Sequence, residues 1–469
     1  MIQKNYSRRL STEVRVGNVM LGGNNPIRIQ SMANTSTMDT AGSVAQAKRI
    51  VDAGGEIVRF TTQGQREAQN MRLIKEALRA DGYAVPLVAD VHFNAAVADT
   101  AAEICEKVRV NPGNYVDPAR TFKKLSYTDE EYADEIKKID ERFVPFLNIC
   151  KQHGTAVRIG VNHGSLSDRI MSRYGDTPEG MVESCMEFLR ICVRERFKDV
   201  VISIKASNTV VMVRTVRLLV AQMDKEGMAF PLHLGVTEAG DGEDGRIKSA
   251  VGIGALLCEG IGDTIRVSLS EAPEHEIPVA RKLVEFIPEC AEARERAKAG
   301  IADDTVRLTF HETELENLQL KAAMTAGALF IDGLAHKLVI ENEGFSPRQL
   351  QELADAILQA ARIKFTKTEF ISCPGCGRTL YNLEDTIARI KAAVKQQAAH
   401  DPRFATLKIG IMGCIVNGPG EMADADYGYV GAGVGKISLY KGKQCIEKNI
   451  PEAEAVDKLI DFICKDLQG

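Results

Sequence analysis

The sequence lacks the concentration of positive charge that proteins use to bind nucleic acids or lipid surfaces. Its 469 residues include 59 Lys and Arg against 64 Asp and Glu, a formal net charge of -5, and the basic residues form no block. Nucleic acids and anionic membranes are bound through clustered Lys and Arg. The sequence therefore predicts a small-molecule or protein partner, with no nucleic acid and no membrane as partner.

Long apolar runs are also missing. Residues 1–11 include basic side chains but no apolar segment of signal-peptide length, and the longest apolar stretches, such as residues 250–258, are too short to cross a bilayer. The 11 cysteines are odd in number and dispersed, and several, such as Cys185 and Cys258, stand in apolar segments as reduced core thiols do. Together these features predict a cytoplasmic protein without a disulfide framework.

Short apolar runs alternate with helix-length amphipathic segments in the first part of the chain. Strands that alternate with helices form parallel sheets, and eight such units fit a closed barrel of roughly 250 residues. No Gly-x-Gly-x-x-Gly follows the first run, so a dinucleotide-binding fold is not indicated. We predict an α/β protein in which residues 1–290 form a TIM barrel. The eight runs are residues 27–31, 56–60, 86–90, 107–111, 156–160, 200–205, 231–235 and 264–268.

The remainder of the chain is predicted to form two further parts. Residues 291–367 are mostly helical by pattern and contain Gly327-Ala-Leu-Phe-Ile-Asp-Gly333, which repeats the Gly254-Ala-Leu-Leu-Cys-Glu-Gly260 that precedes the eighth run. We interpret this part as an insert related to a degenerate barrel unit. Residues 368–469 are predicted to form a small α+β domain. Its expected elements are a helix over 383–399, strands over 407–412 and 436–440, and a last helix after Pro451.

Polar side chains gather where the predicted strands end. In a TIM barrel the carboxyl ends of the strands face the active site. Several cations at one mouth would repel one another without an anion, so the pattern indicates a substrate with phosphate or diphosphate groups. For any single arginine the alternative is an outward salt bridge, for the histidine a structural role, and for the glutamate a helix cap. The candidates are Arg59, Asp90, His92, Arg109, Asn111, Arg158, Asn162, Lys205, Glu238 and Arg266.

Three cysteines and one carboxylate stand in two glycine-rich loops of the last domain. Cys373-Pro-Gly-Cys376 is followed by Gly413-Cys414-Ile-Val-Asn-Gly-Pro-Gly-Glu421, and no second Cys-x-x-Cys pair is present to close a zinc site. Thiolates hold iron–sulfur clusters, and glycine amides can donate to cluster sulfur. A carboxylate is a weaker ligand than a thiolate, so Glu421 could leave and let a substrate oxygen bind iron. A zinc site completed by Cys445 is the alternative.

In combination, these motifs resemble the 4-hydroxy-3-methylbut-2-enyl diphosphate synthase family over the barrel and the C-terminal domain. The motifs that carry the resemblance are Asp90-Val-His-Phe, Arg109-Val-Asn-Pro-Gly-Asn, Arg158-Ile-Gly-Val-Asn, Ile204-Lys-Ala-Ser, His233-Leu-Gly-Val-Thr-Glu-Ala-Gly, Arg266-Val-Ser-Leu, Cys373-Pro-x-Cys-x-Arg and Met412-Gly-Cys-Ile-Val-Asn-Gly-Pro-Gly-Glu.

The resemblance implies an enzyme that reduces 2-C-methyl-D-erythritol 2,4-cyclodiphosphate in the non-mevalonate isoprenoid pathway, with ferredoxin or flavodoxin as the electron donor. It implies a [4Fe-4S] cluster held by Cys373, Cys376, Cys414 and Glu421. It implies Glu238 as the acid beside the substrate and Glu421 as the second catalytic residue. The residues that it assigns to substrate binding are Arg59, Asp90, His92, Arg109, Arg158, Asn162, Lys205, Arg266, Ser268 and Asn417.

The insert departs from the family pattern. The family has a compact two-domain form, in which the cluster domain covers the barrel of a dimer partner, and a longer form with a complete extra domain. The insert is too long for the first form and too short for the second, and residues 332–373 resemble the end of the extra domain. The sequence therefore leaves open whether the cluster domain covers its own barrel or that of a partner in a homodimer.

Two other classes of function stay open at the level of sequence. An iron–sulfur electron carrier would need a cluster but no cation-lined barrel. A zinc-containing, aldolase-type lyase of phosphorylated metabolites would need the barrel but no reductant.

Overall fold

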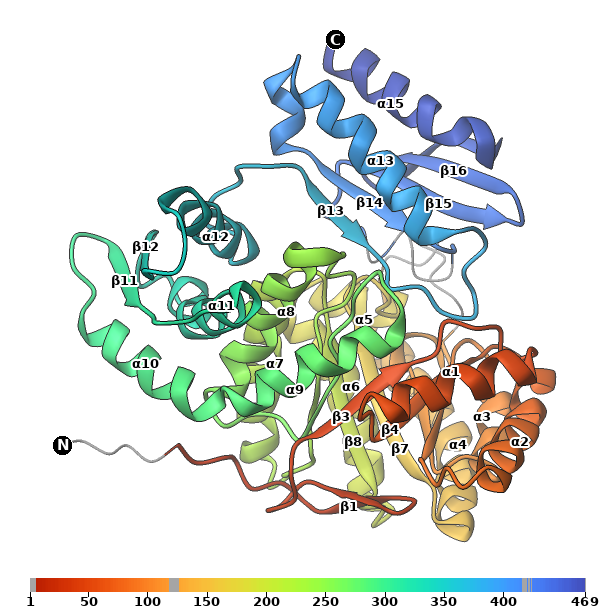
Figure 1. The fold of residues 1–469 in the computed structure, drawn as a ribbon. Helices are drawn as coiled ribbons and strands as arrows, with labels where there is room; N and C mark the ends of the chain where they lie inside the picture. Colours follow the sequence, from red (N-terminus) through yellow and green to blue (C-terminus); the bar gives the residue numbers. More distant parts are fainter. Residues whose placement is uncertain (1–5, 118–125, 416–419, 421, 423, 469) are drawn as a thin grey trace.

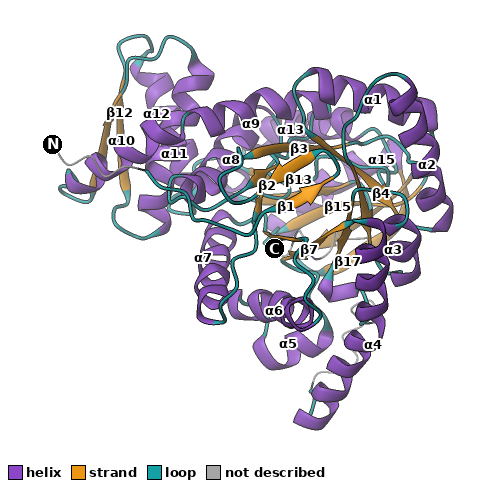
Figure 2. Ribbon diagram, turned by 90° about the horizontal axis from the view of Figure 1, so that it is seen from below, coloured by secondary structure: helices purple, strands orange, loops and turns teal. Residues whose placement is uncertain are grey.

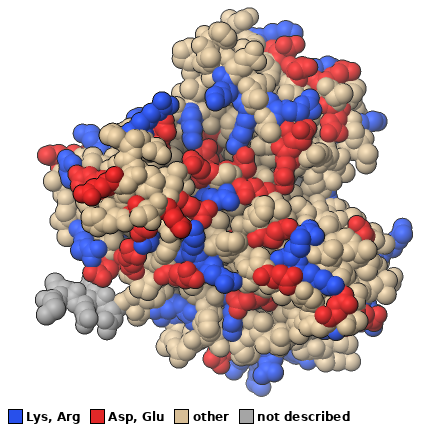
Figure 3. Space-filling view, in the orientation of Figure 1, with Lys and Arg blue, Asp and Glu red and all other residues tan. Residues whose placement is uncertain are grey.

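The computed structural model describes residues 6–117, 126–415, 420, 422 and 424–468 of the chain. Within them the chain forms a barrel, an insert at its side and a C-terminal domain above its mouth (Figure 1). Lys and Arg are interspersed with Asp and Glu over the face seen in Figure 3. None of the described helices has the length and apolar character needed to span a membrane.

Eight parallel strands form the barrel, in the order β8-β7-β6-β5-β4-β3-β10-β9. A parallel bridge between Ile202 of β8 and Leu232, just before β9, closes the ring. Each strand overlaps one of the predicted apolar runs, so the predicted TIM barrel is confirmed. The strands are β3 (Arg28–Met32), β4 (Ile57–Thr62), β5 (Leu87–Val91), β6 (Lys107–Val110), β7 (Ala156–Asn162), β8 (Val200–Lys205), β9 (His233–Leu234) and β10 (Thr264–Ile265).

Helices follow the strands and surround the barrel (Figure 2). Local capping explains their boundaries, as in α4, where Thr128 and Glu131 form a capping box and Gly154, with a φ of 65°, ends the helix. The helices are α1 (Thr40–Asp52), α2 (Gln65–Ala80), α3 (Ala95–Ala102), α4 (Asp129–His153), α5 (Asp168–Tyr174), α6 (Pro178–Arg194), α7 (Thr209–Lys225), α8 (Gly242–Leu257) and α9 (Glu276–Glu285), with the 3-10 turns η1 (Pro112–Asn114) and η2 (Pro273–His275).

An N-terminal hairpin, which the sequence analysis did not predict, closes the bottom of the barrel. Its strands β1 (Val14–Val16) and β2 (Val19–Leu21) pair in antiparallel fashion. The apolar side chains of the hairpin form one buried cluster with those at the amino ends of four barrel strands, so the barrel is sealed opposite its mouth. The cluster consists of Val14, Val16, Leu21, Ile57, Val88, Ala156 and Val201.

The insert packs on the barrel through an apolar helix. It comprises α10 (Ile287–Ala299), β11 (Thr305–Thr309), α11 (Leu315–Ile331), β12 (Lys337–Glu341) and α12 (Pro347–Ala360). The strands β11 and β12 are parallel and are connected by α11, which is the connectivity of a βαβ unit. Gly254 of α8 and Gly327 of α11, the first residues of the sequence repeat, lie where the two helices meet. A Cβ added to Gly327 would lie 3.0 Å from the Cα of Val251.

The C-terminal domain is built on a five-stranded sheet, as expected for an α+β domain. Its strands lie in sequence order and form an apolar core with α13 (Leu383–Ala398) and α15 (Glu452–Gln468), and the turn η3 (Pro402–Thr406) precedes the second strand. Both predicted helices are present, and three of the strands were not predicted because they are short or rich in glycine and charged residues. The strands are β13 (Glu369–Ser372), β14 (Lys408–Met412), β15 (Tyr427–Gly433), β16 (Lys436–Lys441) and β17 (Gln444–Pro451).

The C-terminal domain lies over the mouth of the barrel of the same chain. Ser270, which follows β10, donates through Oγ to the carbonyl oxygen of Cys373 at 2.9 Å. The backbones of Gly164 and Gly420 also meet, and a Cβ on Gly164 would lie 2.2 Å from the carbonyl oxygen of Gly420. Contacts within one chain therefore join the two domains at the mouth.

Ion pairs also join the C-terminal domain to the barrel and to the insert. Lys248 of α8 lies 2.9 Å from Glu369 at the start of β13, and both side chains are at most 10% exposed. Arg362, which follows α12, binds the same carboxylate. Burial would raise the pKa of Glu369, but the two cations lower it to about 2, so the carboxylate stays ionised. Barrel, insert and C-terminal domain thus share one buried charge cluster.

Candidate active site

A cavity lies between the barrel mouth and the C-terminal domain. Every strand of the barrel contributes to its wall, either directly or through the residues that follow the strand. The C-terminal domain contributes the two cysteine loops. The residues that line the cavity from this domain are Cys373, Pro374, Gly375, Cys376, Arg378, Met412, Gly413 and Cys414.

The barrel residues proposed from the sequence for substrate binding all reach this cavity. Strand register explains the convergence, because Arg109 is the register partner of both Asp90 and Arg158, and residues in register point to the same face. The alternative prediction, that these arginines point outward and form salt bridges, is therefore wrong. The residues placed in the wall are Arg59, Asp90, His92, Arg109, Arg158, Asn162, Lys205, Glu238, Arg266 and Ser268. Asn417 and Glu421 lie outside the described residues.

Asn111 is the exception among the candidates at the strand ends. Its side chain donates to Ser165 Oγ at 3.0 Å and accepts from the amide of Gly113 at 3.2 Å. It therefore joins the loop after β6 to the loop after β7 and takes no part in the cavity wall that the structure describes.

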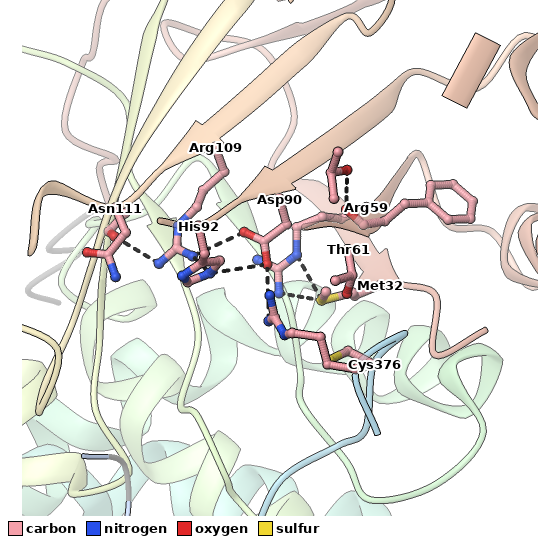
Figure 4. Close-up of polar contacts among 12 residues, drawn as sticks. Met32, Arg59, Thr61, Asp90, His92, Arg109, Asn111 and Cys376 are labelled. Carbon is pink, nitrogen blue, oxygen red and sulfur yellow. Dashed lines mark hydrogen bonds and ion pairs between the residues drawn. The ribbon is translucent and has the colours of Figure 1, made fainter. Parts of the chain in front are cut away.

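Asp90 is central to the charge arrangement of the cavity (Figure 4). Its Oδ1 lies 3.1 Å from Arg109 Nη1, and its Oδ2 lies 3.7 Å from His92 Nε2. Burial would raise the pKa of Asp90, but Arg59 and Arg109 hold it well below its ordinary value, so the carboxylate is ionised. Burial, followed by the charge of Arg109, lowers the pKa of His92 to about 3, so this imidazole is neutral near pH 7.

Cations outnumber carboxylates in the described wall. Asp90 and Glu238 face six cations, and Arg158 Nε and Nη1 have no hydrogen-bond partner in the described part of the chain although the residue is only 1% exposed. Burial, followed by the charge of Arg59, lowers the pKa values of Arg158 and Lys205 well below their ordinary values. Such a cluster is suited to an anion with several charged oxygens. The six cations are Arg59, Arg109, Arg158, Lys205, Arg266 and Arg378.

Two contributors to this site were missed by the sequence analysis. Glu276, the first residue of α9, binds Arg266 in a bidentate pair, with Nη2 2.8 Å from Oε1 and Nε 3.0 Å from Oε2. An acid at the start of a helix ordinarily interacts with the helix dipole, so the position of Glu276 in the sequence did not indicate that it binds Arg266. Arg378 was quoted only as part of a cysteine motif. Its place two residues after Cys376 was the available signal.

Glu238 has a left-handed backbone conformation. Its φ is 47°, the residue is 7% exposed, and it follows β9 in the wall of the cavity. This conformation costs a residue with a side chain about 1–2 kcal/mol, so the surrounding structure must hold it. The strained turn keeps a buried carboxyl group at the cavity.

The three cysteines of the C-terminal domain form the roof of the cavity. Cys373 Sγ accepts a hydrogen bond from the amide of Gly413 at 3.2 Å. Burial raises the pKa of the Cys373 thiol to about 12. The amides of Gly413 and Gly375 oppose this effect, because their hydrogen bonds favour the thiolate. Burial would lower the pKa of Arg378, but the charges of Cys376, Asp90 and Cys414 hold it above its ordinary value.

These surroundings fit an iron–sulfur cluster with thiolate ligands, because amide donors and a buried cation both stabilise negative sulfur. Among the residues that the structure describes, no three His, Cys, Asp or Glu side chains are grouped as they would be around one metal ion. Cys445, the fourth sulfur of the zinc alternative, belongs to β17 and is not part of the cavity wall. Its Sγ lies 3.8 Å from the carbonyl oxygen of Glu447.

Comparisons with known proteins identify relatives along nearly the whole chain. The model of the GcpE TIM-barrel domain matches residues 11–281, and that of the GcpE protein C-terminal domain matches residues 369–465. The chain is 54% identical to the 4-hydroxy-3-methylbut-2-en-1-yl diphosphate synthase (flavodoxin) of Bacteroides thetaiotaomicron over 610 residues, which span 98% of each chain. It is 39% identical to that of Akkermansia muciniphila over 573 residues, which span 98% of this chain and 96% of the relative.

Both alignments are longer than this chain of 469 residues, so they contain long gaps in it. Among solved structures, the N-acetylneuraminic acid synthetase of Leptospira borgpetersenii is similar over 60% of this chain and 90% of its own. With 14% identity and a TM-score of 0.38, this similarity is too weak to bear on function. The barrel model alone matches more than half of the chain, and a relative is 54% identical along nearly its whole length, so this chain belongs to the GcpE family.

Proposed function

We propose that this chain is an oxidoreductase that converts 2-C-methyl-D-erythritol 2,4-cyclodiphosphate to (E)-4-hydroxy-3-methylbut-2-enyl diphosphate in isoprenoid precursor biosynthesis by the non-mevalonate pathway. The relatives are named as this synthase. The observation that carries the proposal is the meeting of six cations with three cysteines in one cavity, since a reductive reaction of a diphosphate needs both. An electron carrier would have no use for the cations.

The cofactor in this proposal is a [4Fe-4S] cluster held by Cys373, Cys376 and Cys414. When bound there, the cluster supplies electrons and an iron that acts as a Lewis acid beside the substrate. The amide of Gly413 and the guanidinium of Arg378 support thiolate ligands at these positions. Glu421 as the fourth, replaceable ligand rests on the family resemblance.

The barrel cations bind the diphosphate and set its orientation. Arg158 offers donors that no described residue uses, and Lys205 adds a second buried cation. Arg109 and Arg266 are held in fixed orientations by Asp90 and Glu276, so they lose little freedom when they bind an anion. Further contacts to the substrate are assigned to Arg59, His92, Asn162 and Ser268, which share the wall, and to Asn417 by resemblance.

Glu238 is the proposed proton donor. Ring opening breaks a carbon–oxygen bond to phosphate, and a hydroxyl group leaves as water, so the reaction consumes protons. Asp90 is kept ionised by its cations, and His92 has a pKa of about 3, so neither group is in its acid form near pH 7. Glu238 is the remaining carboxyl group in the described wall, and its backbone directs it to the cavity.

Flavodoxin is the electron donor favoured by the names of the relatives, with ferredoxin as the alternative. The described cysteines are free thiols, which supports a cytoplasmic location. The C-terminal domain covers the barrel of its own chain through the Ser270 and Lys248 contacts, which supports catalysis by one chain. A homodimer in which each chain completes the other is the alternative.

Replacing single cysteines tests the cluster. Anaerobically purified protein should contain about four iron and four sulfide per chain. Cys414→Ser should lose most of both, because it removes a ligand, whereas Cys445→Ser should keep both, because Cys445 is not in the cavity wall. Elemental and sulfide analysis measures the contents. If the unmodified protein contained zinc but no sulfide, and the Cys445→Ser protein lost that zinc, the cluster assignment would be contradicted.

Replacing Glu238 tests the proton donor. Glu238→Gln should lower turnover at least about a hundredfold, because the amide cannot transfer the proton, and should leave the paramagnetic spectrum of the reduced cluster intact. Glu243→Gln, at an exposed acid in the first turn of α8, should keep turnover. Steady-state rates with a chemical reductant measure both variants. Full activity of Glu238→Gln would remove Glu238 from the mechanism.

Mixing two inactive proteins tests closure within one chain. Glu238→Gln impairs the barrel, and Cys414→Ser impairs the C-terminal domain. If each C-terminal domain serves its own barrel, every site of the mixture carries one defect and activity should stay at the level of the separate proteins. Rates before and after co-refolding or prolonged incubation decide this. Restored activity would mean that hybrid dimers assemble an intact site from two chains.

A further inference from the structure

Arg378 is the only cation in the described cavity wall that comes from the C-terminal domain. Of the other five, four stand on barrel strands and Arg266 directly follows β10. The Arg378 side chain is 8% exposed, and its Nη2 lies 3.8 Å from Asp90 Oδ2 of the barrel. Arg378 therefore reaches from the domain with the cysteines into the anion-binding part of the barrel.

Apart from its contact with Asp90 and a side-chain hydrogen bond with Cys376, the Arg378 guanidinium keeps two unused nitrogens. The distance to Asp90 of 3.8 Å is longer than a hydrogen bond, and Asp90 is already bound by Arg109 at 3.1 Å. Nε and Nη1 of Arg378 have no hydrogen-bond partner within the residues described. A buried guanidinium with unused donors is unfavourable until an anion binds them, and its planar shape suits a phosphate group.

The turn that carries Arg378 is held by both domains. The amide of Cys376 donates to Thr379 Oγ1 at 3.0 Å, and the amide of Thr379 donates back to the carbonyl oxygen of Cys376 at 2.9 Å. On the barrel side, Gly377 packs on the loop between β3 and α1, where an added Cβ would lie 2.7 Å from the carbonyl oxygen of Thr35. The position of the guanidinium therefore depends on the seating of the C-terminal domain.

We propose that Arg378 is a phosphate-binding residue through which the substrate fastens the C-terminal domain to the barrel. Without substrate the guanidinium lies near Asp90, and with the diphosphate in the cavity it donates to a phosphate oxygen that the barrel cations also bind. A ligand bound by both domains stabilises the closed arrangement by linkage. This inference rests on the proposed function, since it takes the substrate to be a diphosphate.

The competing role for Arg378 is support of the cysteine loops alone. The negative charges of Cys376 and Cys414 lie close enough for such a role. In that case, replacing the arginine would change the cluster content or the reduction potential and leave the affinity for phosphate compounds unaltered. Affinity and cluster properties must therefore be measured on the same samples.

Calorimetric titration of the cluster-loaded protein under anaerobic conditions provides the test. The ligands are the cyclodiphosphate and, separately, inorganic pyrophosphate. Arg378→Gln should weaken the binding of both by about ten- to a hundredfold, as expected for a hydrogen bond between charged groups. Arg378→Lys keeps the charge and should lose less. Arg389→Gln, at an exposed arginine of α13 in the same domain, should bind like the unmodified protein.

Hydrogen–deuterium exchange on the same samples locates the effect. In the unmodified protein either ligand should slow exchange both in residues 372–380 and in the barrel segment 235–241. In Arg378→Gln only the barrel segment should respond. Unaltered affinity together with unaltered exchange in Arg378→Gln would overturn the proposal, whatever its reduction potential.

Two further outcomes are decisive. If Arg378→Gln holds less iron than the unmodified protein, the Arg378→Lys variant is used in its place. The proposal would be overturned if Arg378→Lys bound the ligands as tightly as the unmodified protein and the ligands did not slow exchange in residues 372–380. If the unmodified protein binds pyrophosphate through Arg378 but does not bind the cyclodiphosphate, the phosphate site is supported and the proposed function fails.

Discussion

Buried positive charge at one end of the barrel is the constraint on which the rest of the structure depends. Two unit charges about 6 Å apart repel each other by roughly 3 kcal/mol at an effective dielectric constant near 20, so several cations in one cavity are a substantial strain on the fold. Asp90 offsets part of this charge through Arg109, and Glu276 does so through Arg266. Arg158 and Lys205 have no such partner among the described ion pairs, and an anionic substrate would supply it.

Much of the apolar packing that stabilises the fold lies away from the cation-lined cavity. At the bottom of the barrel the N-terminal hairpin buries an apolar cluster, and at the side α8 and α11 pack through Gly254 and Gly327. At the mouth the C-terminal domain is seated by the buried Lys248–Glu369 pair and by the Ser270 contact with Cys373. The insert supplies Arg362 to the same carboxylate, so it helps to position the cysteines over the barrel.

Sequence reasoning succeeded where periodicity carried the information. The eight apolar runs predicted the barrel strands, and strand-end polarity predicted that Arg59, Arg109 and Arg158 face one cavity. It missed features that depend on contacts between distant segments. The β1–β2 hairpin has strands of three residues, Glu276 acts on a residue ten positions earlier in the chain, and closure over the mouth depends on side-chain pairs such as Lys248 and Glu369. Local patterns do not encode such long-range pairings.

The central claim is that the cation-lined mouth places a cyclic diphosphate directly beside a cluster held by Cys373, Cys376 and Cys414. The most direct measurement is the electron paramagnetic spectrum of the reduced, cluster-loaded protein before and after addition of 2-C-methyl-D-erythritol 2,4-cyclodiphosphate. The account predicts that the cluster signal changes on addition of the cyclodiphosphate and that pyrophosphate competes with this change. A cluster signal that is identical with and without saturating cyclodiphosphate would contradict it.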